Sequence, residues 1–157
     1  MLDLDSNAYQ IAVRTHTALH IVKGAVVKVM GAEWTAGVFV EGYHGRLTVK
    51  LDRKPSDDEI LQVEREANSK VSEDVEILRH ELDRSEAEAR FGSRLYDVFV
   101  IPAHVTRLSV VEIPGWNVNA CREEHTLRTG DVGRIHVGKT RFRPNKGLLE
   151  IGFDVET

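Results

Sequence analysis

The sequence contains a single cysteine, Cys121, among its 157 residues. This excludes a disulfide within the chain, and it also excludes a zinc finger, which needs two cysteines close together. No apolar run approaches the length that spans a membrane. The first five residues carry two aspartates and lack the basic segment that begins a signal peptide. We therefore expect a protein of the reducing cytoplasm.

The chain also has fewer basic than acidic residues. It contains 21 Lys and Arg and 25 Asp and Glu residues, which gives a formal net charge of −4. No overall field attracts nucleic acid, which weighs against coating of long RNA or DNA but leaves room for a local basic patch. We expect neither DNA nor a membrane as partner. The hydrophobic fraction of 41%, without repeats or flexible linkers, predicts one domain over residues 1–157.

The order of periodic segments predicts an α+β fold, a single compact domain of antiparallel sheet with packed helices. Apolar residues at helical spacing predict a first helix over residues 9–30, capped by Ser6 or Asn7 and ended by Gly31. Ser56 and Glu59 have the spacing of a capping box at the start of a second helix. We expect a third helix over 84–91, and strands over 38–40, 46–51, 75–78, 97–101, 105–113, 132–142 and 148–155.

Two pairs of potential metal ligands have the same four-residue spacing. His16 and His20 would lie on one face of a helix, and Cys121 and His125 follow about a hundred residues later. Three imidazoles and a thiolate suit zinc better than a hard cation. Either pair alone has an ordinary explanation as buried core residues, and the second pair favours ligands. Because Thr17 follows His16, the helix lacks the glutamate of a zinc-protease motif.

The same segments resemble a known family. Residues 14–20 (Arg-Thr-His-Thr-Ala-Leu-His) look like the helix motif of the alanyl-tRNA editing domain, and residues 119–126 (Asn-Ala-Cys-Arg-Glu-Glu-His-Thr) like its downstream segment. Residues 129–135 resemble the stretch that follows it. The likeness is closest to the short, free-standing AlaX-type proteins, without the N-terminal barrel of longer relatives. The implied fold is that of the editing domains of alanyl-tRNA synthetase and threonyl-tRNA synthetase.

The resemblance implies a function. Members of the family hydrolyse the ester that joins a wrong amino acid, mainly serine and sometimes glycine, to alanine tRNA. It implies a zinc-dependent deacylase acting on tRNA(Ala) charged with serine or glycine. It also implies that Thr35 contacts the serine hydroxyl, although Thr35 read alone is an ordinary strand threonine. The implied zinc ligands are His16, His20, Cys121 and His125.

The loop between the last two ligands departs from the family pattern. Many relatives have Cys-Gly-Gly-Thr-His where this chain has Arg122-Glu123-Glu124 between Cys121 and His125. The loss of two glycines leaves the path of the loop open. Four protein ligands mark a structural zinc site, whereas a catalytic zinc keeps a position for water. We expect an exchangeable position, with His125 as the candidate loose ligand and a zinc-associated water as nucleophile.

Candidate RNA contacts are basic residues along the predicted strands and the first helix. Lys139, Arg141 and Arg143 alternate along one strand and could follow phosphates, although a solvated strand explains each one equally well. Asn117 and Asn119 either line the pocket or serve a turn. The full set of candidate RNA contacts is Lys23, Lys28, Lys139, Arg141, Arg143 and Lys146. The histidines that we interpret as surface or structural are His44, His80, His104 and His136.

Two other function classes remain open. One is a zinc-stabilised RNA-binding module without hydrolytic activity. The other is a zinc hydrolase of a small free ester or amide, with which tRNA would not compete. Trp34-Thr35 and the stretch at 129–133 favour editing over both.

Overall fold

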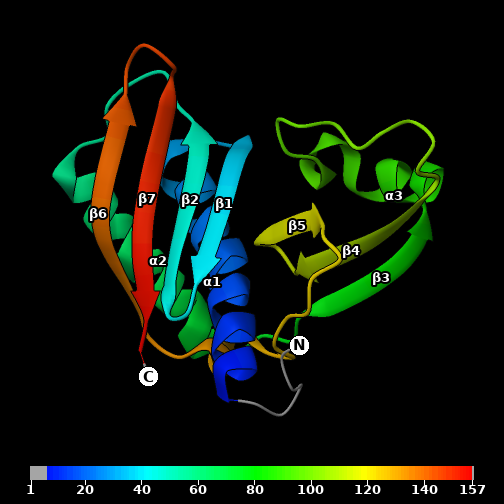
Figure 1. Ribbon diagram of the computed structural model, residues 1–157, viewed down its shortest axis with the longest axis horizontal. Coiled ribbons are helices and arrows are strands. Elements are labelled where there is room, and N and C mark those ends of the chain that lie inside the picture. Colours follow the sequence, from blue (N-terminus) through cyan, green and yellow to red (C-terminus); the bar gives the residue numbers. More distant parts are fainter. Residues whose placement is uncertain (1–6, 157) are drawn as a thin grey trace.

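Two antiparallel sheets flank the long first helix of the chain (Figure 1). The fold is that of a computed structural model, in which residues 7–156 are described. Among these residues we find no helix that combines the length and the apolar character of a membrane span. The helices are α1 (Asn7–Met30), α2 (Asp57–Glu73) and α3 (Arg84–Phe91). The strands are β1 (Thr35–Glu41), β2 (His44–Lys50), β3 (Leu78–Asp83), β4 (Arg107–Ile113), β5 (Asn117–Ala120), β6 (Ile135–Arg143) and β7 (Leu148–Val155). The expected α+β class is confirmed.

The larger sheet has the strand order β1-β2-β7-β6, and α1 and α2 cover one of its faces (Figure 1). Alternate residues of the strands point to that face, so that Leu47 of β2 lies opposite Ile151 of β7 and both are fully buried. Ala18, Val22 and Val26 of α1 join the same core. The helix thereby buries one long side against the sheet and leaves another side for the smaller sheet.

Local sequence signals place the helix ends well. Gly31 follows α1 with φ of 70°, a left-handed conformation that glycine adopts without strain. Asn7 is the first residue of α1, and the alternative cap, Ser6, lies outside the described residues. At α2 the Glu59 amide donates to Ser56 Oγ at 3.1 Å and the Ser56 amide donates to Glu59 Oε1 at 3.0 Å. The predicted capping box is thus confirmed.

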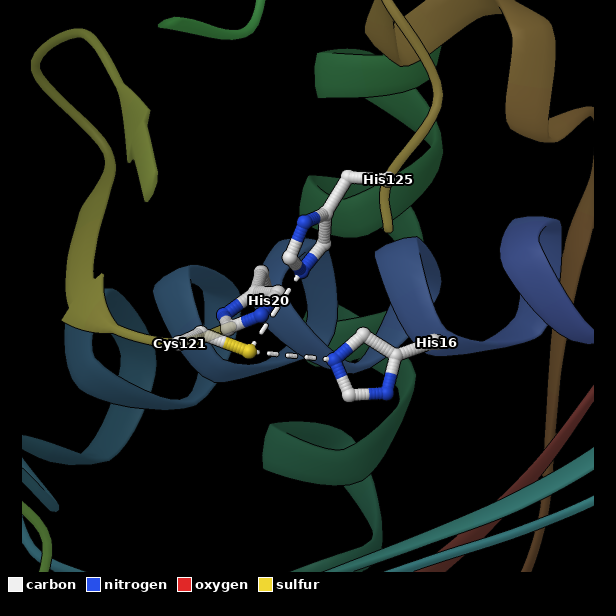
Figure 2. Close-up of side chains that lie close together, drawn as sticks. All are labelled: His16, His20, Cys121 and His125. Carbon is white, nitrogen blue, oxygen red and sulfur yellow. Dashed lines mark hydrogen bonds between the residues drawn. The ribbon is translucent and has the colours of Figure 1, made fainter. Parts of the chain in front are cut away.

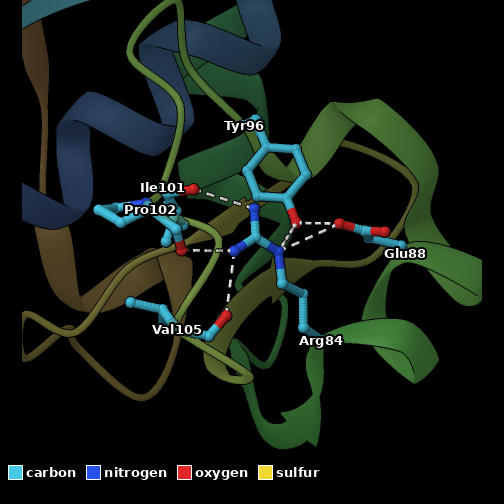
Figure 3. A network of polar contacts seen from close by, with 6 residues as sticks. All are labelled: Arg84, Glu88, Tyr96, Ile101, Pro102 and Val105. Atoms are coloured by element: carbon cyan, nitrogen blue, oxygen red, sulfur yellow. Dashed lines mark hydrogen bonds and ion pairs between the residues drawn. The ribbon is translucent and has the colours of Figure 1, made fainter.

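The predicted strand over 97–101 is wrong, because the whole stretch from 96 to 106 is irregular. Within it the Val98 amide donates to the Thr35 carbonyl of β1, and several carbonyls accept hydrogen bonds from the side chain of Arg84. The Arg84 guanidinium at the start of α3 also meets Tyr96 and Glu88 at one edge (Figure 3). It donates to three carbonyls along the segment, those of Ile101, Pro102 and Val105.

Several strand boundaries also differ from those expected. The hairpin loop between β1 and β2 is shorter, because β1 extends to Glu41 and β2 begins at His44. The strand predicted over 75–78 begins only at Leu78, and the long strand predicted from 105 begins at Arg107. Residues 129–132 form a 3₁₀ turn, so that β6 starts at Ile135. Apart from the absent strand over 97–101 and the additional strand β5, the elements follow one another in the predicted order.

The smaller sheet, in the order β3-β4-β5, is joined to α1 through Trp116, the residue before β5. Its indole Nε1 donates to the Ile21 carbonyl of α1 at 2.9 Å. This approach needs glycine at position 24, because a Cβ there would lie 2.1 Å from the indole nitrogen. Lys28 of α1 and Lys70 of α2 both lie over the indole ring.

Replacing Gly24 by alanine is therefore expected to lower the free energy of unfolding by about 1–3 kcal/mol, the usual cost of overpacking a tight contact. Urea unfolding followed by circular dichroism measures this change. Gly37→Ala is the matched control, because its Cβ would lie 3.8 Å from the nearest atom, Thr48 Cβ, at ordinary contact distance. Equal stability of the two variants would contradict a packing role for Gly24.

Candidate metal centre

The fold brings the two predicted ligand pairs together between α1 and the segment after β5 (Figure 2). Cys121 Sγ lies 3.4 Å from His16 Nε2 and 3.7 Å from His125 Nε2. The imidazole of His20 stacks edge-on to His16, with ring centroids 5.4 Å apart, and lies 4.8 Å from the His125 ring. One donor atom from each of the four side chains lies within 4.8 Å of every other.

These separations fit a tetrahedral metal ion. With Zn–S near 2.3 Å and Zn–N near 2.0–2.1 Å, tetrahedral angles put the sulfur and each nitrogen roughly 3.5 Å apart. The two sulfur–nitrogen distances agree with that value. His20 Nε2 supports the fit, because it is a buried polar atom with no hydrogen-bond partner among residues 7–156. A cation at the centre of the cluster would satisfy it.

Burial keeps the nitrogen ligands in the form that binds metal. It lowers the pKa of His16, and it lowers the pKa of His20 well below the usual value, with help from the neighbouring His125 and His16. The pKa of His125 falls to about 3, through burial and the charges of His16 and Arg79. Burial also raises the pKa of the Cys121 thiol. Metal binding at neutral pH therefore has to release a proton from the thiol but none from the imidazoles.

The metal-free protein is accordingly expected to lose stability as the pH falls below about 6.5. The unfolded chain then takes up protons on its histidines, whereas the folded chain does not do so at His125 until about pH 3, so acid favours unfolding. Urea unfolding of chelator-treated protein between about pH 7.5 and 5.5 measures the loss. His125→Asn should reduce it, while replacement of the exposed His104 should not. An unchanged slope in His125→Asn would refute this account.

One threonine fixes the second ligand pair against the first. Thr17 is buried on α1 between the two histidines, and its hydroxyl donates to the Val13 carbonyl at 2.8 Å. The same oxygen accepts the amide of Thr126, the residue after His125, at 2.9 Å. The residue that rules out a protease motif thus has a positioning role that sequence spacing did not reveal.

A small cavity of about 100 Å³ lies beside the cluster, between α1 and β5. Asn117 and Asn119 of β5 both line it, in agreement with one of the two roles expected of them. The Asn117 amide lies 3.3 Å from His20 Nδ1, which ties the cavity to the metal centre. Lys23 and Asp97 face each other across it.

Thr35 is buried near this cavity at the start of β1. Its Oγ1 accepts a hydrogen bond from Lys23 Nζ at 2.6 Å, and the same ammonium donates to the Glu33 carbonyl at 2.6 Å. Burial lowers the pKa of Lys23 to about 8, against the raising effect of Asp97. Because Thr35 Oγ1 accepts from Lys23, its own hydroxyl proton is free to be donated to another group.

His16 and Cys121 of the cluster also line an open groove of about 600 Å³. Its walls come from the start of α1, from Val38, Phe39 and Val40 of β1, and from residues 122–124. Phe39 is 39% exposed. The four-donor cluster is therefore reachable from solvent through a groove that is largely apolar, with charged residues at one rim.

The candidate RNA-contacting residues do not form one surface. Lys23 points into the cavity, Lys28 pairs with Glu66 at 2.8 Å, and Arg143 pairs with Glu150. Lys139, Arg141 and Lys146 are exposed along or just after β6, the edge strand farthest from β1 (Figure 1). The charges of Arg143, Arg46 and Arg141 all act on the Glu150 carboxylate, so Arg46 of β2, which has no motif in the sequence, lies in the same basic region.

Other histidines have polar partners away from the cluster. His80 meets Glu112 at 2.9 Å, and His136 meets Glu156 at 3.0 Å. His44 meets Asp154 at 3.1 Å. These contacts agree with the structural or surface role expected of them.

No protein-family model matches the chain. It is, however, 38% identical over 143 residues to the alanine–tRNA ligase of Methanopyrus kandleri, a match over 90% of this chain and 15% of that protein. It is 40% identical over 141 residues to the ligase of Pyrococcus abyssi, covering 89% of the chain and 15% of the relative. With the ligase of Staphylothermus marinus the identity is 37% over 152 residues, a match that covers 96% of this chain and 16% of that protein. The chain spans only about a sixth of the length of these relatives.

Proposed function

Because the chain is homologous to one segment of alanine–tRNA ligases, we propose that it edits tRNA(Ala) by hydrolysing the ester of a wrongly attached serine, and of glycine as a second substrate. The observation that carries the proposal is the partly buried four-donor cluster beside an open groove. The groove reaches His16 and Cys121, and the small cavity reaches His20 through Asn117. An aminoacyl ester lying in the groove would thus meet the cluster directly.

Zinc is the cofactor that this donor set suits best, held by His16, His20, Cys121 and His125. When bound, it would supply polarisation of the ester carbonyl and a lowered pKa for the attacking water. The chain itself supplies orientation. An aminoacyl ester is labile enough that positioning of the carbonyl and the water accounts for much of the rate.

Selection of serine is assigned to Thr35 and its surroundings. The Thr35 hydroxyl oxygen already accepts a hydrogen bond from Lys23. Its own proton can therefore be donated to the hydroxyl oxygen of the serine side chain. Alanine offers no such oxygen and would leave buried polar groups unpaired. This is the type of site that demands a hydroxyl, whereas an apolar pocket discriminates poorly for or against one.

A deacylation assay tests the proposal. Purified protein is mixed with tRNA(Ala) charged with serine, glycine or alanine, with and without a chelator, and release of the amino acid is followed. We expect rapid release of serine, slower release of glycine, little release of alanine, and loss of all three with chelator. Cys121→Ser, which keeps the size of the side chain but not the thiolate, should behave like the chelated protein. Serine release at the uncatalysed rate would overturn the proposal.

One alternative has an observation in its favour. Four protein donors within 4.8 Å fill a tetrahedron, as in structural zinc sites. A zinc-stabilised module that binds tRNA without hydrolysing it would bind stoichiometrically in the same assay and show no turnover.

The exposed basic residues of the outer strands are the proposed contact for the tRNA backbone. Binding should weaken as salt rises, and Lys139→Ala combined with Arg141→Ala should lower tRNA affinity and flatten the salt dependence by roughly two units of slope. The rate on saturating substrate should change little. Filter binding at several salt concentrations measures both quantities. A double variant that binds like the unaltered protein would leave these residues as an ordinary solvated strand.

A further inference from the structure

Arg79 of β3 joins the two halves of the second ligand pair from outside the cluster. Its Nη1 donates to the Cys121 carbonyl at 3.1 Å and to Ser109 Oγ. Its Nη2 donates to the Glu123 carbonyl and meets His125 Nδ1 at 3.1 Å. Four acceptors therefore engage the four hydrogens of the two terminal nitrogens. Arg79 was not identified from the sequence, since it lies more than forty residues before the loop that it contacts.

These contacts explain how the loop closes without glycine. Arg122, Glu123 and Glu124 all have negative φ, a conformation open to any residue. Arg79 binds the carbonyl of the first ligand and that of Glu123, so the path of the loop is held by a side chain from the neighbouring sheet. The departure from the glycine-containing pattern is therefore compensated locally.

The contact with His125 has a fixed direction. A guanidinium has only N–H donors, so His125 Nδ1 must accept. In a neutral imidazole the proton then lies on the other nitrogen, Nε2, which faces Cys121 Sγ at 3.7 Å. A nitrogen that carries a proton has no lone pair to offer a metal. A ligating histidine ordinarily has the opposite arrangement, in which its outer nitrogen donates to a carbonyl or carboxylate.

His20 differs from His125 in this respect. Its outer nitrogen, Nδ1, faces the amide of Asn117 at 3.3 Å, and an amide can present either its oxygen or its nitrogen to the ring. The Nε2 of His20 is free to turn its lone pair to a metal. Arg79 cannot adapt in this way, so the asymmetry is built into the chain.

We propose that Arg79 is a positioning residue that makes His125 the exchangeable member of the cluster, so that His16, His20 and Cys121 hold the metal ion and His125 presents an N–H beside the remaining position. This inference rests on the zinc site of the proposed function. It leaves one coordination position of the metal for water or substrate, with the N–H group of His125 as a hydrogen-bond donor beside that position. The tests below use metal binding and NMR, so they do not depend on whether tRNA is deacylated.

The first test reads the proton on the ring. In protein labelled with ¹⁵N-histidine, two-bond ¹H–¹⁵N correlations distinguish the two imidazole tautomers, with and without one equivalent of zinc. We expect the Nε2–H form for His125 in the unaltered protein and in Arg79→Lys, which keeps a donor without an acceptor. Arg79→Met, of similar length but with no donor, should move His125 towards Nδ1–H. An Nδ1–H form of His125 in the unaltered protein would overturn the proposal.

The second test is a double-mutant cycle on zinc affinity, measured by competition with a chromophoric chelator. Alone, His125→Ala should weaken zinc binding by less than about 10-fold, whereas His16→Ala should weaken it by roughly 100-fold or more. In the Arg79→Met background, His125→Ala should cost about 10-fold more than it does alone, because His125 has become a ligand. Cobalt substitution provides the spectroscopic signature, since the visible absorption should intensify in Arg79→Met as coordination by the protein becomes four-fold. Equal losses for His125→Ala and His16→Ala in the unaltered protein would overturn the proposal.

Discussion

Loss of zinc and of deacylase activity together is the expected result of replacing His20 by alanine. His20 is the most buried member of the cluster, at 7% exposure, and its Nε2 has no other hydrogen-bond partner in the described part of the chain. Without it, two imidazoles and a thiolate remain, one of them on the loop that Arg79 holds. We expect zinc content to fall to a small fraction of one ion per chain and serine release to fall by roughly 100-fold or more. Elemental analysis and the deacylation assay measure these quantities.

Two controls separate metal loss from misfolding. Cys121→Ser removes the thiolate at a half-buried position with almost no change in volume, so the circular dichroism spectrum should be unchanged while zinc and activity are lost. His44→Ala removes a surface histidine whose partner is Asp154, and it should keep both. Full metal content in a His16→Ala, His20→Ala double variant would refute the assignment of the cluster as the zinc site.

The second large effect is expected at Thr35. Thr35→Val should reduce the rate of serine release by roughly 10-fold or more, because about one good hydrogen bond is lost in the transition state. The change is nearly isosteric in volume, but it removes the acceptor that Lys23 Nζ uses at 2.6 Å as well as the proposed donor to serine. Lys23 keeps the Glu33 carbonyl as a partner, so the fold and the zinc content should persist.

The rate ratio between serine and alanine substrates is the decisive measurement for Thr35. In Thr35→Val this ratio should fall, because the serine hydroxyl is no longer required. Thr35→Ser retains a hydroxyl at the same position and should restore most of the ratio. If the ratio is unchanged in Thr35→Val, Thr35 has no part in specificity, and the metal centre stands independently.

Local signals in the sequence were sufficient for the elements whose stability is local. The helix over α1, its end at Gly31 and the Ser56–Glu59 capping box depend on neighbours within one or two turns, and each is confirmed. The resemblance to the alanyl-tRNA family is confirmed by the identity with alanine–tRNA ligases over about 90% of the chain. The spacing within each ligand pair is also a local property, which is why the cluster could be anticipated.

The fold class, the long first helix and the spacing within each ligand pair could be predicted from the sequence, because periodicity and a four-residue interval are properties of neighbouring residues. The meeting of the two pairs, and the identity of the groups around the four donors, follow from the packing of elements that are distant in the sequence. Within the irregular stretch from 96 to 106, Arg84 binds the carbonyls of Ile101, Pro102 and Val105. Thr17, Lys23 and Arg79 take their roles from partners 12 to 109 residues away. Such contacts depend on packing between distant elements, and hydrogen-bonding partners at that separation leave no periodic trace in a single sequence.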